Sequence, residues 1–169
     1  MSKVEATLSP SMDIQVSSNF ERLLFDLFDR DGRALAKAMA SFRASGTMRA
    51  SSAQLLRARG LFDAGRLDDA GTVRVIAEAL RDTGELLDPH TAVGYAVARQ
   101  KRGNPELPMV VLATAHPAKF PDAVERAVGT RPQLPERLAD LYKRPERCTV
   151  LDNDLQALQQ LMDTTPAPR

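Results

Sequence analysis

The sequence predicts a helix-rich α/β fold, and two observations support this. Most of the chain carries apolar residues at helical spacing, set between capping residues and glycine stops. One segment instead has five consecutive apolar residues, Met109 to Ala113, between Pro108 and a polar cluster. A short apolar run of this kind is typical of a strand buried on both faces, as in a parallel sheet. We therefore expect a chain that is roughly half helix with one clear strand.

The expected helices follow from capping residues and apolar stripes. The first has Ser18 and Glu21 as a predicted capping box, and a later one has Asp88 as N-cap with Pro89 in its first position. The full set begins near Asn19 and continues with Arg33 to Ala44, Ser51 or Ser52 to Arg59, Asp68 or Asp69 to Gly84, Asp88 to about Arg102, Pro121 to Val128, Leu134 to Tyr142 and Asn153 to Met162.

The predicted sheet is incomplete in this chain. Besides the apolar run, only Thr47 to Ala50 and Thr149 to Leu151 are candidates for short strands. A strand that is apolar on both faces needs neighbours, because each backbone polar group buried without a partner costs about 1 to 3 kcal/mol. We expect sequence outside this chain to complete the sheet.

Composition favours one domain and excludes several classes of function. With 169 residues and 43% hydrophobic content, we expect a single partial domain over residues 1–163 and a flexible tail over residues 164–169. A net charge of +1 argues against nucleic acid and anionic membranes as partners. No apolar run approaches the ~20 residues of a membrane span, and the amino terminus does not resemble a signal peptide. The single cysteine, Cys148, suits a reducing compartment, so we expect a cytoplasmic location.

Polar residues follow the predicted strand directly. Thr114 and His116 come at its carboxyl end, where ligands of open α/β sheets bind. Metal binding is not expected, because the two histidines, His90 and His116, lie far apart in the sequence and no metal-ligand motif accompanies them. Cys148 with a histidine as a nucleophilic dyad lacks supporting context, and an inert cysteine is the favoured interpretation.

Three segments, in order, resemble threonine synthase. Residues 113–120, Ala-Thr-Ala-His-Pro-Ala-Lys-Phe, are similar to a signature near the end of that enzyme. Residues 9–22 and 87–92 are similar to two earlier segments of its last third, and residues 153–162 to its closing helix. The resemblance implies the carboxyl-terminal portion of a pyridoxal-phosphate enzyme of fold type II, the tryptophan synthase β-like fold.

The resemblance implies a function for the whole enzyme rather than for this piece. Threonine synthase converts O-phospho-L-homoserine and water into L-threonine and phosphate with pyridoxal 5'-phosphate as cofactor. None of the five lysines stands in the Ser-Phe-Lys-Asp context of the family's Schiff-base lysine, and no Gly-rich phosphate loop is present. We therefore expect a carboxyl-terminal fragment without catalytic residues of its own, inactive alone, whose partner is the missing amino-terminal part of the enzyme.

Site residues are carried over from the family or suggested by residue type. The family's threonine beside the pyridine nitrogen corresponds to Thr114, although a threonine that only ends a strand is the alternative. Candidate substrate contacts carry hydroxyl, amide, imidazole or cationic groups: Ser18, Asn19, Arg22, His116 and Lys119. For these, helix capping, loop support and a solvated surface lysine are the competing interpretations.

Two other functions stay open. A non-catalytic helical interaction module with the same fold is the alternative from another class, and its basis is the absent lysine. Another pyridoxal-phosphate lyase or deaminase is disfavoured, because the segments around Met12 and Thr114 resemble threonine synthase in particular. His90, in the turn at Asp88, is expected either to satisfy a helix end or to approach the active site.

Overall fold

The computed structural model describes residues 4–165, which are helical or irregular and contain no β-strand. The chain divides into two compact units, Met1–Gln133 and Leu134–Arg169. The single domain expected over residues 1–163 stays a prediction. Of the tail expected to be flexible, residues 166–169 lie outside the described residues.

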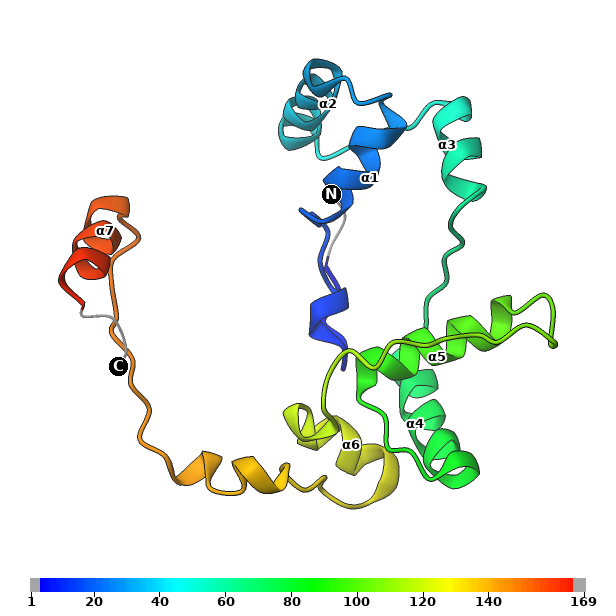
Figure 1. Cartoon of the computed structure of the whole chain (residues 1–169), viewed down its shortest axis with the longest axis vertical. Coiled ribbons are helices and arrows are strands. Elements are labelled where there is room, and N and C mark those ends of the chain that lie inside the picture. Colours follow the sequence, from blue (N-terminus) through cyan, green and yellow to red (C-terminus); the bar gives the residue numbers. More distant parts are fainter. Residues whose placement is uncertain (1–3, 166–169) are drawn as a thin grey trace. The chain divides into compact units, whose positions relative to one another are not determined.

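The core of the first unit lies among three helices: α4 (Asp69–Thr83), α5 (Pro89–Lys101) and α6 (Pro121–Val128). Helix α4 lies against both α5 and α6, and the three helices are drawn from green to yellow in Figure 1. Their facing surfaces bury the residues Val75, Ile76, Ala92, Ala96, Ala123 and Val124. Burial of such apolar surface contributes roughly 25 cal/mol per Å², which makes this trio the main stabilising element of the unit.

The other helices of the first unit precede this core in the chain. They are α1 (Phe20–Leu27), α2 (Gly32–Ser45) and α3 (Ser52–Arg59), and α1 contacts both of the others. Helix α3 begins with a capping box between Ser51 and Gln54. A short 3₁₀ helix, η1 (Pro10–Met12), lies closer to the amino terminus.

Helix boundaries agree with most sequence predictions because the caps are local. Asp68 and Asp88 cap α4 and α5 as predicted, and Gly84 and Gly129 end α4 and α6 in left-handed conformations. The predicted capping box of Ser18 and Glu21 is wrong. Asn19 holds the N-cap position with helical backbone angles, and no side chain caps it.

The second unit contains less helix than predicted. In place of a helix over residues 134–142, it has two 3₁₀ turns, η3 (Glu136–Leu138) and η4 (Leu141–Lys143), before α7 (Leu155–Thr164). Short helices are marginal in water unless an apolar face packs on something. Leu141 and Tyr142 are exposed, so the predicted helix has no surface here to pack against.

The predicted strand over residues 109–113 is an extended segment, and its burial on both faces is not observed. Val110 and Leu112 are 78% and 75% exposed. The short strands expected at residues 47–50 and 149–151 are also absent from the described part of the chain. The reason is physical: a strand exists only when a neighbour accepts and donates its backbone hydrogen bonds, and residues 4–165 supply none.

No helix in the described range, residues 4–165, combines the length and the apolar character that a membrane span requires.

Candidate functional site

The three segments that carry the family resemblance meet at His90. The backbone N–H of Ser11 donates to His90 Nε2 at 3.2 Å, although 79 positions separate the two residues. The ring of Phe120 lies 4.6 Å from the imidazole, centroid to centroid, at an interplanar angle of 53°. Residues from η1, the start of α5 and the loop after the extended segment therefore form one cluster.

Asp88 is the anchor of this cluster. Its side chain caps α5 and is almost fully buried, with 1% of the residue exposed. One carboxylate oxygen accepts from the His90 backbone N–H at 2.9 Å and lies 3.0 Å from His90 Nδ1. The other oxygen accepts from the backbone N–H and the hydroxyl of Thr91. A buried carboxylate is tolerated only with such partners, and here both oxygens have them.

The hydrogen bonds assign a tautomer to His90. A carboxylate only accepts, so Nδ1 carries the hydrogen toward Asp88, whereas Nε2 must accept from the Ser11 N–H. The ring is thus neutral and has both nitrogens occupied. Of the two roles expected for His90, the structure supports the structural one at the start of the helix.

Thr114 lies at the edge of the cluster and is exposed. Its backbone N–H donates to Thr91 Oγ1 at 3.0 Å, and the two hydroxyl oxygens are 3.4 Å apart. The residue is therefore held from one side by helix α5 while its side chain stays accessible. A hydroxyl in this setting is chemically able to bond a ring nitrogen of a ligand.

His116 and Lys119 follow Thr114 and are both exposed. His116 Nδ1 accepts from the backbone N–H of Ala118 at 3.1 Å and so caps the 3₁₀ turn η2 (Pro117–Lys119). Lys119 Nζ lies 5.9 Å from the centroid of the Phe120 ring. The contacts of His116 support the loop, and those of Lys119 leave its ammonium group at the surface.

Ser18, Asn19 and Arg22 lie at the start of α1 and are exposed. Arg22 Nη2 donates to Asn19 Oδ1 at 3.1 Å, and Ser18 and Arg22 line a shallow hollow together with Asp26. No hydrogen bond among the described residues joins these side chains to Asp88 or Thr114. The structure therefore brings the predicted residues together as two separate groups, one at α1 and one at the Asp88 cluster.

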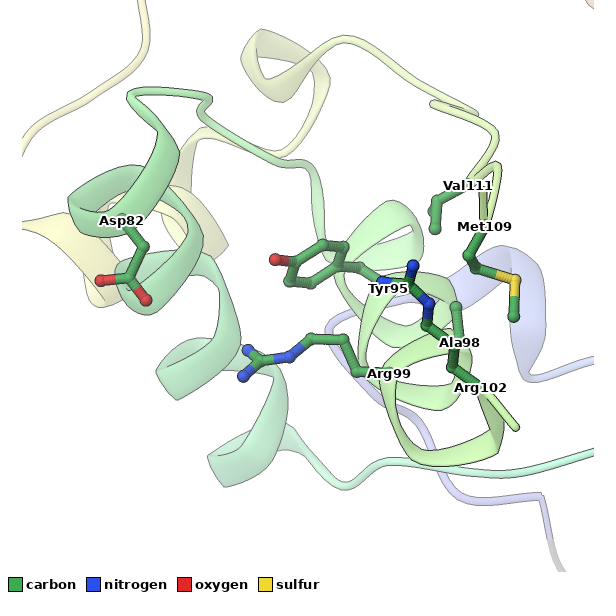
Figure 2. Close-up of a pocket in the computed structure, with 7 residues that line it drawn as sticks. All are labelled: Asp82, Tyr95, Ala98, Arg99, Arg102, Met109 and Val111. Carbon is green, nitrogen blue, oxygen red and sulfur yellow. The ribbon is translucent and has the colours of Figure 1, made fainter. Parts of the chain in front are cut away.

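The extended segment before Thr114 is covered on one face only. Met109 and Val111 point toward α5, where they line a cavity of about 310 Å³ with Tyr95 and Ala98 (Figure 2). Arg99 lies in the same cavity, 5.6 Å from the centre of the Tyr95 ring. The side chains of Val110 and Leu112 are exposed, so side chains alternate along this extended segment and one of its faces has no partner among the described residues.

Sequence reasoning missed Thr91 and Ser11 as members of the cluster. For Thr91 a signal existed: it is three residues after the N-cap Asp88, within reach of that carboxylate. For Ser11 and for the contact between Thr91 and Thr114, no local pattern is available, because these contacts join segments distant in the sequence.

Comparisons of the sequence with known proteins point to one enzyme family. The family model "Threonine synthase, C-terminal" matches residues 91–162. The chain is 54% identical to a threonine synthase of Pseudomonas aeruginosa over 90% of its own length and 33% of the relative. It is 41% identical to a threonine synthase of Corynebacterium glutamicum over 91% of its length and 33% of the relative.

Solved structures of threonine synthases are also similar to this chain. The crystal structure of threonine synthase from Brucella melitensis, with bound pyridoxal phosphate, matches with a TM-score of 0.84 and 50% identity. That match covers 95% of this chain and 34% of the Brucella chain. Threonine synthase from yeast matches with a TM-score of 0.80 and 29% identity, over 97% of this chain and 37% of the yeast chain.

These structural matches identify the fold class of the chain. It is the helix-rich carboxyl-terminal portion of an α/β enzyme fold, and the sheet is incomplete in this chain, as predicted. The chain matches the carboxyl-terminal region of threonine synthases. It spans about a third of the length of the curated relatives it matches.

Proposed function

We propose that this chain provides the carboxyl-terminal third of a threonine synthase, which converts O-phospho-L-homoserine and water into L-threonine and phosphate. The observation that carries the proposal is the meeting of the three resembling segments at His90, because a chance resemblance has no reason to converge in space. The identity of 54% to the Pseudomonas enzyme supports it. A cytoplasmic location is part of the proposal.

Thr114 is the residue proposed to contact pyridoxal phosphate. The residue is exposed and its backbone is tied to α5 through Thr91, so it offers a positioned hydrogen-bonding group to a pyridine nitrogen. When bound, the cofactor supplies an electron sink for elimination and replacement chemistry. A neutral hydroxyl bonds the ring nitrogen without the charge pairing that a carboxylate provides, which moderates that sink.

The remaining candidates are proposed as substrate contacts. Lys119 presents a cation suited to the phosphate of O-phospho-L-homoserine, and Arg22 presents a second one at α1. Ser18, Asn19 and His116 offer polar atoms in the same two groups. Local hydrogen bonds already engage Arg22, Asn19 and His116, so a role in binding requires them to exchange or share these partners.

The rest of the enzyme is proposed to cover the exposed face of the extended segment. Val110 and Leu112 present apolar side chains there, and the backbone in this segment has the extended form that a neighbouring strand pairs with. Without the Schiff-base lysine, which the family carries in its amino-terminal part, the isolated chain is proposed to be inactive.

A chimera tests the proposal. This chain replaces the matching third of the Pseudomonas aeruginosa threonine synthase, and phosphate release from O-phospho-L-homoserine is measured. We expect activity within about tenfold of the parent enzyme, and at least about 100-fold less when Thr114→Val is introduced. The matched control is Thr130→Val, an exposed threonine of the loop after α6.

The outcomes separate the two functional hypotheses. A folded chimera that binds pyridoxal phosphate but releases no phosphate contradicts the proposed activity and favours the non-catalytic module. The isolated chain, assayed in parallel, is expected to release no phosphate above a buffer blank.

A further inference from the structure

We propose that Thr91 is a positioning residue that, together with Asp88, fixes the place of Thr114 and the direction of its hydrogen bonding. The inference deepens the proposed function, on which its consequence for the cofactor rests. Its basis is a chain of hydrogen bonds that runs from a buried carboxylate to an exposed hydroxyl through one side chain.

The first link fixes the proton of Thr91. Asp88 is buried and accepts hydrogen bonds through both carboxylate oxygens. One of these oxygens accepts from the hydroxyl of Thr91. A hydroxyl has a single hydrogen, so Thr91 Oγ1 has none left for another partner. Toward every other group the Thr91 hydroxyl can therefore only accept a hydrogen bond.

The second hydrogen bond connects Thr91 to Thr114. The backbone N–H of Thr114 donates to Thr91 Oγ1 at 3.0 Å, which ties the end of the extended segment to the first turn of α5. The hydroxyl oxygens of Thr91 and Thr114 are 3.4 Å apart. Since the Thr91 hydroxyl only accepts there, Thr114 is the donor whenever this contact forms a hydrogen bond. To donate to a ring nitrogen of the cofactor, the Thr114 hydroxyl must turn its single hydrogen away from Thr91, while the backbone bond to Thr91 stays in place.

Burial shows why a threonine is needed at position 91. The residue is 4% exposed beside Ala92 and Val93, so a valine of the same shape fills the site equally well. The hydroxyl is what valine does not supply, and its two partners are Asp88 and Thr114. A buried pair thus holds the backbone of an exposed residue.

Amide hydrogen exchange of the complete 169-residue chain tests the positioning directly, with no cofactor required. Thr91→Val is expected to speed exchange of the Thr114 amide by about tenfold, because the acceptor is removed. Thr91→Ser keeps the hydroxyl and is expected to retain the protection. The matched control is Thr72→Val: Thr72 is 2% exposed on α4 and its hydroxyl donates to the Asp68 carbonyl, away from Thr114.

Equal protection of Thr114 in the Thr91→Val and Thr72→Val chains overturns the proposal. If Thr91→Val does not fold, the Thr91→Ser chain decides: retained protection supports the positioning role, and tenfold faster exchange at Thr114 refutes it.

The consequence for the cofactor is measured in the chimera with a double-mutant cycle on the dissociation constant of pyridoxal phosphate. Thr91→Val is expected to weaken binding several-fold, about 3- to 10-fold, when Thr114 is present and to have no further effect in the Thr114→Val background. Additive effects contradict an action through Thr114. If Thr114→Val alone leaves binding unchanged, the proposed cofactor role of Thr114 fails, while the exchange experiment still decides whether Thr91 positions it.

Discussion

Ser11 and His90 are joined by a hydrogen bond of 3.2 Å from the Ser11 backbone N–H to the imidazole Nε2. The bond attaches the amino-terminal segment to the start of α5, and the other ring nitrogen is bound to Asp88. The imidazole is 6% exposed and packs against Phe120. The His90 side chain thus connects the three segments that resemble threonine synthase.

The first prediction concerns the two histidines. His90→Ala is expected to destabilise the chain by about 2 to 4 kcal/mol, because it removes a buried ring, one of the hydrogen bonds to Asp88 and the acceptor of the Ser11 N–H. His116→Ala is the control, since that exposed residue only caps a 3₁₀ turn and its loss is expected to cost less than about 1 kcal/mol. Urea unfolding followed by circular dichroism measures both, and equal losses would refute the central role of His90.

The second prediction concerns the core between α4, α5 and α6. Ile76 is completely buried there, so Ile76→Ala is expected to cost about 2 to 5 kcal/mol of unfolding free energy. Leu56 on α3 is 74% exposed, and Leu56→Ala is expected to change stability by less than about 0.5 kcal/mol. A thermal melt that shifts equally in both variants would place the core elsewhere.

The third prediction concerns the turn after α4. Gly84 has a φ of +79°, and an added Cβ meets no atom within 4 Å. Gly84→Ala is therefore expected to cost about 1 kcal/mol through backbone strain alone. Gly103 is equally open but lacks a positive φ, so Gly103→Ala is expected to be neutral or slightly stabilising. Chemical denaturation of the two variants distinguishes strain from crowding.

The fourth prediction concerns acid titration in the second unit. A side-chain hydrogen bond from Arg144 lowers the pKa of the Asp140 carboxyl below its usual value. A lowered pKa in the folded state means that the stabilising contribution is full above the unfolded pKa and is lost as the pH falls through the folded pKa. The contribution is small and is screened by salt, since both side chains are exposed.

Carboxyl NMR titration of Asp140 measures this effect. In the Arg144→Met chain, the pKa of Asp140 is expected to rise back toward the usual value of an aspartate. An unchanged titration curve in that variant would contradict the assigned cause.

The sequence predicts what local chemistry decides. Asp88 as N-cap and Gly84 as helix stop follow from neighbouring residues, and the structure confirms them. The helix expected over residues 134–142 fails because its stability would come from packing that the second unit does not supply.

At the candidate site, the sequence and the family resemblance indicate Thr114 but not what holds it. The contact from Thr91 to Thr114 spans 23 positions, and the bond from Ser11 to His90 spans 79. Such contacts depend on how helices pack, which a local pattern does not encode. The extended segment is not a two-sided strand for a related reason, because no other segment among the described residues pairs with it.

The one-sided covering of residues 107–113 has a consequence for handling the protein alone. An extended segment with apolar side chains such as Leu107, Val110 and Leu112 in solvent is a template for intermolecular β-pairing. The isolated chain is therefore expected to self-associate at high concentration, and a lysine placed at one of these positions is expected to improve its solubility.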